Sequence, residues 1–157
     1  MKRRIIFGLL IAAIFLLCIV IMTACGSKEA VSAETFKQKA EELNYTVVDL
    51  TDQFEDYPHV LKCYVFANDE DIHVEFYEVE NADKATGMFN TNRATIESYK
   101  GTVSSNSEVN LNSYSKYTLK TDEMYYVAER VGATMIYAEC AKANAKILDD
   151  FINALGY

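Results

Sequence analysis

An uncharged stretch at residues 5–22 divides this chain into two parts that belong to different environments. The stretch is almost wholly apolar, a basic segment at residues 2–4 precedes it, and small residues at positions 23–24 follow it. This order of basic, apolar and small segments is typical of an export signal, which is removed and takes no part in the mature fold. The fold must therefore be built from the remainder of the chain.

Thr23 and Ala24 are small and Cys25 follows them, so this segment resembles the cleavage site of a bacterial lipoprotein signal. The resemblance implies that a peptidase cuts before Cys25 and that its sulfur carries a diacylglyceryl group. Cys18 fits this pattern less well, because bulky leucines precede it. An uncleaved signal anchor is the alternative, since a helix over the uncharged stretch would be about 27 Å long, close to the hydrocarbon thickness of a bilayer. In both cases residues 26–157 are expected at the cell membrane, outside the cytoplasm.

We divide the chain into a signal peptide at residues 1–24, a tether at 25–32 and a single α+β domain at 33–157. About 130 residues follow the signal, which is enough for one buried core. The signal holds three of the 15 basic residues, so 12 remain against 23 acidic residues, a net charge of −11. Such a domain should be repelled by nucleic acid and by anionic lipid surfaces, which leaves the lipid on Cys25 as its link to the membrane.

Hydrophobic periodicity and turn residues predict three helices and six strands. We expect helices at 33–43, 82–99 and 142–155, and strands at 45–50, 60–67, 72–79, 114–120, 124–131 and 133–140. Ser32 and Asn81 are expected to cap the first two helices, and Asn44 and Gly156 to end the first and the last, as residues that suit a left-handed stop. A turn or short helix is expected at 51–58, and a loop or edge segment at 102–113. Short connections imply antiparallel pairing. The predicted fold is therefore α+β, a two-layer sandwich of about five or six antiparallel strands with the three helices on one face.

Alternation of side chains along the neighbouring strands expected at 60–67 and 72–79 predicts a partly polar, aromatic face. In the second of these strands, Ile72, Val74 and Phe76 are expected under the helices, and in the first strand Leu61 and its alternate residues join them. The opposite, outer face would then consist of Lys62, Tyr64, Phe66, His73, Glu75 and Tyr77. This face is either an ordinary solvated sheet surface or a contact surface for a ligand or another envelope protein.

Two cysteines and two polar residues of the predicted core also require an explanation. Cys63 and Cys140 lie in apolar strands in an oxidising compartment, where they either form a disulfide or remain free and buried. Asn92 interrupts the apolar stripe of the second helix, and Arg130 lies in an otherwise apolar strand. Each needs a hydrogen-bond partner if it is buried. Structural pairing, for Arg130 with a carboxylate such as that of Glu75 or Glu129, and anchoring of a ligand are both open.

The remaining residues offer no specific catalytic or metal-binding pattern. His59 and Cys63 are about 13 Å apart on an extended strand, too far to share one zinc ion. His73 and Glu75 are closer, but two ligands do not define a metal site. The glycines are too scattered for a phosphate-binding loop. We therefore predict no metal and no cofactor, and we do not expect an enzyme.

Beyond its signal, the chain resembles small lipoproteins of unassigned activity from monoderm bacteria in the runs Glu75-Phe76-Tyr77 and Arg130-Val-Gly-Ala-Thr134. The resemblance supplies no mechanism. We expect a non-catalytic binding or structural module of the cell envelope, held at the membrane by its lipid, with an envelope protein or a small ligand as partner and no nucleic acid. A small envelope enzyme, or an inhibitor of one, is the alternative.

Overall fold

The structure, a computed structural model, describes residues 28–67 and 72–157. The predicted signal peptide, its alternative as an anchor and the predicted lipid attachment at Cys25 lie outside the described residues. Among the helices that the structure does describe, none has both the length and the apolar character that a membrane crossing requires.

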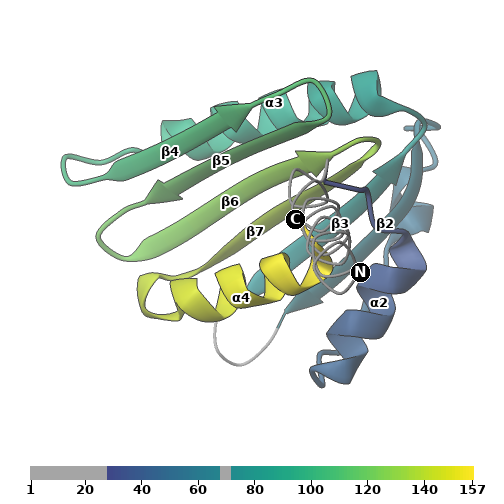
Figure 1. The fold of residues 1–157 in the computed structure, drawn as a ribbon, viewed down its shortest axis with the longest axis horizontal. Helices are drawn as coiled ribbons and strands as arrows, with labels where there is room; N and C mark the ends of the chain where they lie inside the picture. Colours follow the sequence, from purple (N-terminus) through teal and green to yellow (C-terminus); the bar gives the residue numbers. More distant parts are fainter. Residues whose placement is uncertain (1–27, 68–71) are drawn as a thin grey trace, which may run out of the picture.

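Seven strands form one antiparallel sheet in the order β1-β2-β3-β7-β6-β5-β4 (Figure 1). The strands are β1 Val48–Asp49, β2 Val60–Ala67, β3 His73–Val79, β4 Ser105–Asn110, β5 Tyr114–Lys120, β6 Met124–Val131 and β7 Thr134–Ala141. The predicted number of strands is too low, because part of the stretch expected as a loop or an edge segment becomes β4 and pairs along the whole of β5. This strand is exposed on both faces, so its sequence carries no apolar alternation.

Three α-helices accompany the sheet: α2 Ala33–Glu42, α3 Ala82–Ser98 and α4 Ala145–Leu155, with short 3-10 turns η1 Thr51–Phe54 and η2 Lys142–Asn144. The predicted capping of α2 and α3 is confirmed, since Ser32 and Asn81 each accept a hydrogen bond from a backbone N–H in the first turn. The predicted left-handed ends are also confirmed, with φ of 64° at Asn44 and 93° at Gly156.

The helices lie on both faces of the sheet, so the expectation of a two-layer sandwich with all helices on one face is wrong. In Figure 1, α2 and α4 cross in front of the sheet and α3 lies behind it. We call these the α2–α4 face and the α3 face. The physical reason is found in β6 and β7, whose side chains are buried on both sides. A strand that is apolar on both sides needs cover on both.

The core of the α2–α4 face is aromatic. The ring of Phe36 from α2 stacks on that of Phe76 from β3 at 4.8 Å between centroids. Phe66 from β2 contacts Tyr45 at 4.5 Å and Phe151 from α4 at 5.1 Å. These rings connect both helices to the same strands, and burial of each contributes about 1.5–3 kcal/mol.

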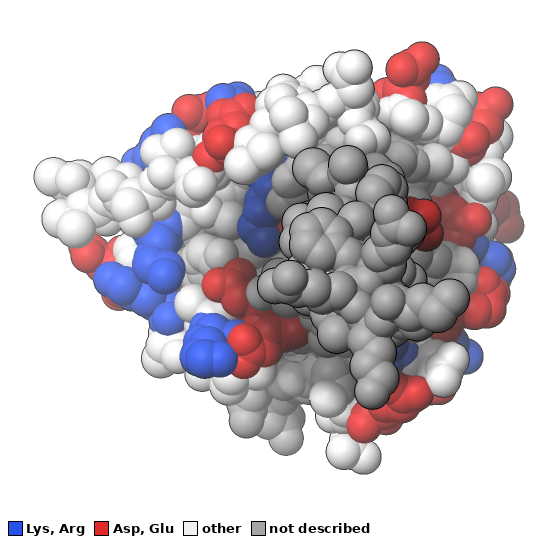
Figure 2. All heavy atoms as spheres, in the orientation of Figure 1, with Lys and Arg blue, Asp and Glu red and all other residues white. Residues whose placement is uncertain are grey.

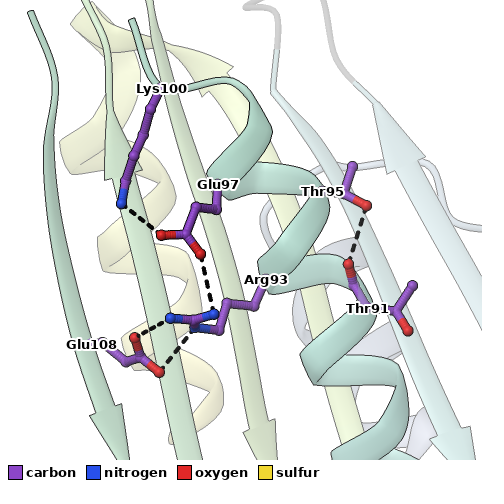
Figure 3. A network of polar contacts seen from close by, with 6 residues as sticks. All are labelled: Thr91, Arg93, Thr95, Glu97, Lys100 and Glu108. Carbon is purple, nitrogen blue, oxygen red and sulfur yellow. Dashed lines mark hydrogen bonds and ion pairs between the residues drawn. The ribbon is translucent and has the colours of Figure 1, made fainter.

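On the α3 face, the buried side chains of Phe89 and Ile96 contact Tyr117 and Leu119 of β5. The same helix is linked to the edge strand by charge (Figure 3). Arg93 donates hydrogen bonds to both carboxylate oxygens of Glu108 in β4, at 2.9 and 2.8 Å. The α3 helix therefore crosses from β3 to the β4 edge, and it leaves a corner of the α3 face without a helix above it.

Candidate ligand-contact face

The predicted outer face is divided between the two sides of the sheet. Cys63 lies opposite Tyr77 and Val65 opposite Glu75, whereas Tyr64 lies opposite Phe76. Directly paired residues point to the same side. The expectation of one common face is therefore wrong, although the alternation within each strand is as predicted.

A one-residue difference in register produces this result. Pairing of β2 with β3 shifts between Val60 and Lys62, so β2 gains one residue relative to its partner. A shift of one residue exchanges the two faces of a strand. Lys62, opposite Glu78, is half-buried on the α2–α4 face, and Tyr64 and Phe66 are buried under α2 and α4. Tyr64 and Phe66 are core residues and contribute no contact surface.

The other three predicted residues, His73, Glu75 and Tyr77, lie together on the α3 face. Cross-strand pairing places His73 opposite Glu139 and Glu75 opposite Tyr137, and Tyr126 of β6 lies opposite Glu139. Tyr99, which follows α3, packs against Tyr126 with its ring tilted by 36° and 5.1 Å between the ring centroids. We call this group the tyrosine–glutamate cluster, and its members are His73, Glu75, Tyr77, Tyr99, Tyr126, Tyr137 and Glu139.

Hydrogen bonds fix the orientation of both carboxylates of the cluster. Glu75 contacts His73 Nε2 through one oxygen at 2.9 Å and accepts a hydrogen bond from the Tyr77 hydroxyl through the other at 2.6 Å. Glu139 accepts a hydrogen bond from the Tyr137 hydroxyl at 2.7 Å. The side chains of His73 and Glu75 retain 34% and 27% of their exposure. The cluster is thus ordered by its own contacts and still open to solvent.

The pKa values of the cluster follow from these contacts. The hydrogen bond to Glu75 raises the pKa of His73 above its ordinary value, although burial opposes this shift. Burial alone would raise the pKa of Glu75, but the hydrogen bonds from His73 and Tyr77 outweigh it and the net pKa is lowered. Burial, followed by the hydrogen bond to Glu139, raises the pKa of Tyr137. Near neutral pH the cluster therefore presents ionised Glu75 among neutral phenols.

A hollow lies between η1 and α3, beside the tyrosine–glutamate cluster. It has a volume of ≈ 410 Å³ and is lined largely by apolar groups. Its lining residues are Phe54, Tyr57, His59, Val60, Asp83, Lys84, Gly87, Met88, Thr91 and Asn92. The ring of Phe54 packs edge-on against Tyr77 at 5.7 Å, so this hollow adjoins one end of the tyrosine–glutamate cluster.

The two polar residues predicted in the core have structural partners. Asn92 donates to the backbone carbonyl of Met88 within its own helix at 3.0 Å. Arg130 is buried, and it donates to the carbonyls of Leu111 and Asn112 in the β4–β5 hairpin at 3.0 and 3.1 Å. It does not bind the carboxylate of Glu129, because adjacent residues of a strand point to opposite faces. The expected Arg130–carboxylate pairing is wrong, and the partners are main-chain oxygens.

The two cysteines are free and buried. Cys63 belongs to the core beneath the start of α3, whereas Cys140 belongs to the core beneath α4. The sheet therefore lies between them, and the alternative of a disulfide is excluded. Burial raises the pKa of Cys63 to about 12 and that of Cys140 to about 11, which makes both thiols poor nucleophiles.

Sequence reasoning found three members of the cluster and missed Tyr99, Tyr126, Tyr137 and Glu139. The missed residues come from strands and a helix end far along the chain, and only the insertion of β7 beside β3 brings them together. Glu139 alternates with Ala138 and Cys140, which was a signal of an outward-facing polar position. Within the described residues, no group of three or more histidine, cysteine or acidic side chains is arranged to hold a metal ion.

The chain was compared with known proteins. No protein-family model matches it, and no curated protein matches it. It is similar to a crystal structure of a GTP binding regulator from Thermotoga maritima, with 20% sequence identity over 80% of this chain and 85% of that chain, and a TM-score of 0.48.

Proposed function

We propose that this protein is a lipid-anchored binding module of the cell envelope that contacts positively charged groups through the tyrosine–glutamate cluster. The order of the N-terminal segments and the position of Cys25 support the anchor. The cluster itself supports the binding role. A non-catalytic role is favoured because Cys63, which lies opposite Tyr77 of the cluster, is buried with its pKa raised to about 12 and is therefore no activated nucleophile.

The observation that carries the binding proposal is the combination of two carboxylates with four tyrosines on an open part of the sheet. Tyrosine faces attract cations, and an ionised carboxylate beside them adds Coulomb attraction. Glu75 and Glu139 are both held by tyrosine hydroxyls, so their orientation needs no change when a ligand binds. A primary or quaternary amine is the ligand class that this arrangement fits best.

The anchor is tested by mass spectrometry of the protein isolated from membranes of an expressing bacterium. We expect a chain that begins at Cys25 and carries the mass of a diacylglyceryl group on that residue. An intact Met1, or an unmodified thiol at Cys25, contradicts the lipid anchor. The first of these outcomes would favour the uncleaved anchor.

The binding role is tested with tetramethylammonium as probe and tert-butanol as its neutral analogue. We expect the cation, and not the alcohol, to shift the NMR signals of Tyr126 and Tyr137. Glu75→Gln and Glu139→Gln should each weaken binding about fivefold, the effect of losing one nearby charge in water. Glu34→Gln, an exposed position on α2, is the matched control and should have no effect.

Two results oppose this assignment. Equal NMR shifts with the alcohol and the cation would show that the site binds apolar groups and does not recognise charge. Unchanged binding in both glutamate variants would show that the cation binds elsewhere. In either case the cluster is an ordinary solvated surface of the sheet.

A further inference from the structure

The described chain begins on the α2–α4 face, at the part of the sheet that no helix covers. Lys28 forms an ion pair with the buried carboxylate of Glu129 at 2.8 Å. Its ammonium group also lies over the ring of Tyr114, 4.1 Å from the centroid. Lys116 of β5 holds the second oxygen of Glu129 at 2.7 Å. The N-terminal segment is thus fixed to β5 and β6 on one specified side of the molecule.

This attachment limits how far the domain can be from its anchor. Three peptide units separate Cys25 from Lys28, and an extended chain spans at most about 3.6 Å per residue. A lipid on Cys25 therefore holds Lys28, with the start of β5 and the end of β6 that it contacts, within about 11 Å of the membrane surface. The α3 face, with the tyrosine–glutamate cluster, is on the opposite side of the sheet.

A cavity of ≈ 170 Å³ borders the other end of β5 on this face, about 13 Å along the strand from Lys116, and its lining includes two lysines and three hydroxyl side chains. Its lining residues are Val103, Ser104, Ser105, Lys120, Thr121 and Lys142. Ser105 lies directly opposite Lys120 across the β4–β5 pair, so the two share a side of the sheet. At about 30 Å³ for each water in the liquid, the volume equals about six water molecules, and a tetrahedral oxyanion can enter.

The lysines of this cavity are not neutralised by the protein. Neither Lys120 nor Lys142 forms an ion pair with any residue of the described ranges, 28–67 and 72–157. The ammonium nitrogen of Lys120 lies over the ring of Tyr125, 5.0 Å from the ring centroid. Asp122 and Glu123, in the next turn, line an adjoining hollow that shares Val103 and Thr121 with this cavity and extends to Tyr99 and Tyr126 of the α3 face. Figure 2 shows the resulting group of basic atoms, at left over the end of β5 and the start of α4.

We propose that the open part of the α2–α4 face rests on the bilayer, and that the cavity lined by Lys120 and Lys142 binds a phosphate group of an anionic lipid headgroup. This proposal rests on the lipid anchor at Cys25 proposed above. The domain as a whole is acidic, but charges more than about 8 Å from the surface are screened at physiological salt. The unpaired lysines nearest the membrane therefore decide the orientation, and the tyrosine–glutamate cluster faces the external medium.

The proposal is tested with the full lipidated protein in vesicles of phosphatidylcholine, with and without phosphatidylglycerol. Amine acetylation followed by peptide mass spectrometry reports the reactivity of each lysine. We expect Lys120 and Lys142 to react about fivefold more slowly when the anionic lipid is present, which is the effect expected for one lysine near an anionic surface. Lys84 of α3, on the opposite side of the sheet, is the internal control and should react equally in both.

A pair of variants separates orientation from local binding. Lys146 on α4 retains 83% of its side-chain exposure and serves as a reporter close to Lys142. It should be shielded by anionic vesicles in the wild type. The double variant K120Q/K142Q should lose this shielding, and the control K84Q should keep it.

The outcomes distinguish this inference from the anchor on which it rests. Equal reactivity in both vesicles, with the diacylglyceryl mass present on Cys25, overturns the inference and leaves the anchor intact. An unmodified Cys25 overturns the anchor itself. Equal protection of Lys120 and Lys142 by inorganic phosphate, on protein in detergent without lipid, assigns the cavity to a free anion and overturns the lipid headgroup as its ligand.

Discussion

At the scale of single residues, polar side chains in this protein are placed by their hydrogen bonds. Glu75 is oriented by His73 and Tyr77, and Arg130 is oriented by carbonyls of a hairpin. The sequence indicated that Asn92 and Arg130 would need partners, because each interrupts an apolar pattern. It did not indicate which partners, since the carbonyls that Arg130 binds come from the hairpin before β5, and main-chain oxygens leave no trace in a pattern of side chains.

The His73–Glu75 pair predicts a pH dependence of stability. The raised pKa of His73 contributes to the free energy of unfolding; this contribution is complete below pH 6.5 and is lost as pH rises through the folded-state pKa. The lowered pKa of Glu75 gives one that is complete above pH 4.5 and is lost as pH falls. Urea denaturation should show His73→Gln to be less stable by up to about 1 kcal/mol between these limits, and by less at alkaline pH.

The control for this measurement is His59→Gln, which changes a histidine without a carboxylate partner among the described contacts. Its effect should not vary with pH in the same way. A constant difference between wild type and His73→Gln at every pH would contradict the predicted role of the pair.

Arg130→Met should lower the free energy of unfolding by about 2–4 kcal/mol, because the hairpin carbonyls lose their charged donor. Hydrogen exchange should show faster opening of the β4–β5 hairpin in particular. Arg93→Met, which removes an exposed ion pair with Glu108, is the comparison and should cost less than about 1 kcal/mol. If Arg130→Met folds with wild-type stability, the residue is free to serve a ligand and our structural assignment is wrong.

At the scale of elements, local sequence signals predicted the helix ends and most strands. The side of the sheet on which each side chain lies depends instead on how the strands pair. Capping residues and left-handed stops act within a few residues, so Ser32, Asn44 and Gly156 could be identified from the sequence. The relative register of β2 and β3 could not, because a bulge near Val60 shifts one strand by one residue. Side-chain alternation within each strand does not specify which residues of the two strands pair across the turn between them. Half of the predicted contact face was lost for this reason.

Gly87 provides a test of what a helix tolerates. It lies inside α3 and borders the hollow beside η1, and a Cβ added there would meet no atom within 4 Å. Gly87→Ala should therefore raise the free energy of unfolding by roughly 0.5–1 kcal/mol, the usual gain from alanine inside a helix. Gly156→Ala should have the opposite sign, about 1 kcal/mol destabilising, because φ is 93° at that position. Thermal denaturation of the two variants measures both.

At the scale of the whole molecule, the predicted α+β class is confirmed and the predicted number of layers is wrong. The apolar pattern of β7 does not say whether its two sides are covered by helices or by other chains. Which side each helix covers depends on the path from β3 through α3 to the far edge at β4, a connection that no local signal specifies. The same connection creates the tyrosine–glutamate cluster, which could not be found before strand order was known.

The separation of the two cysteines by the sheet has a measurable result. We expect no reaction of Cys63 or Cys140 with a thiol reagent in the native protein, and reaction of both after unfolding in denaturant. A reducing agent should leave the melting temperature unchanged, since there is no bond between them to break. A lower melting temperature after reduction would contradict this arrangement.

The central position of β7 also affects when this domain can form. Before residues 134–141 are made, no strand pairing joins β1–β3 to β4–β6. The last strand to be synthesised, β7, therefore supplies the pairing that joins the two groups of three strands into one sheet. We therefore expect the complete sheet to form only after β7 has been made, because its pairing with β3 spans about 60 residues of chain and is the slowest contact to close.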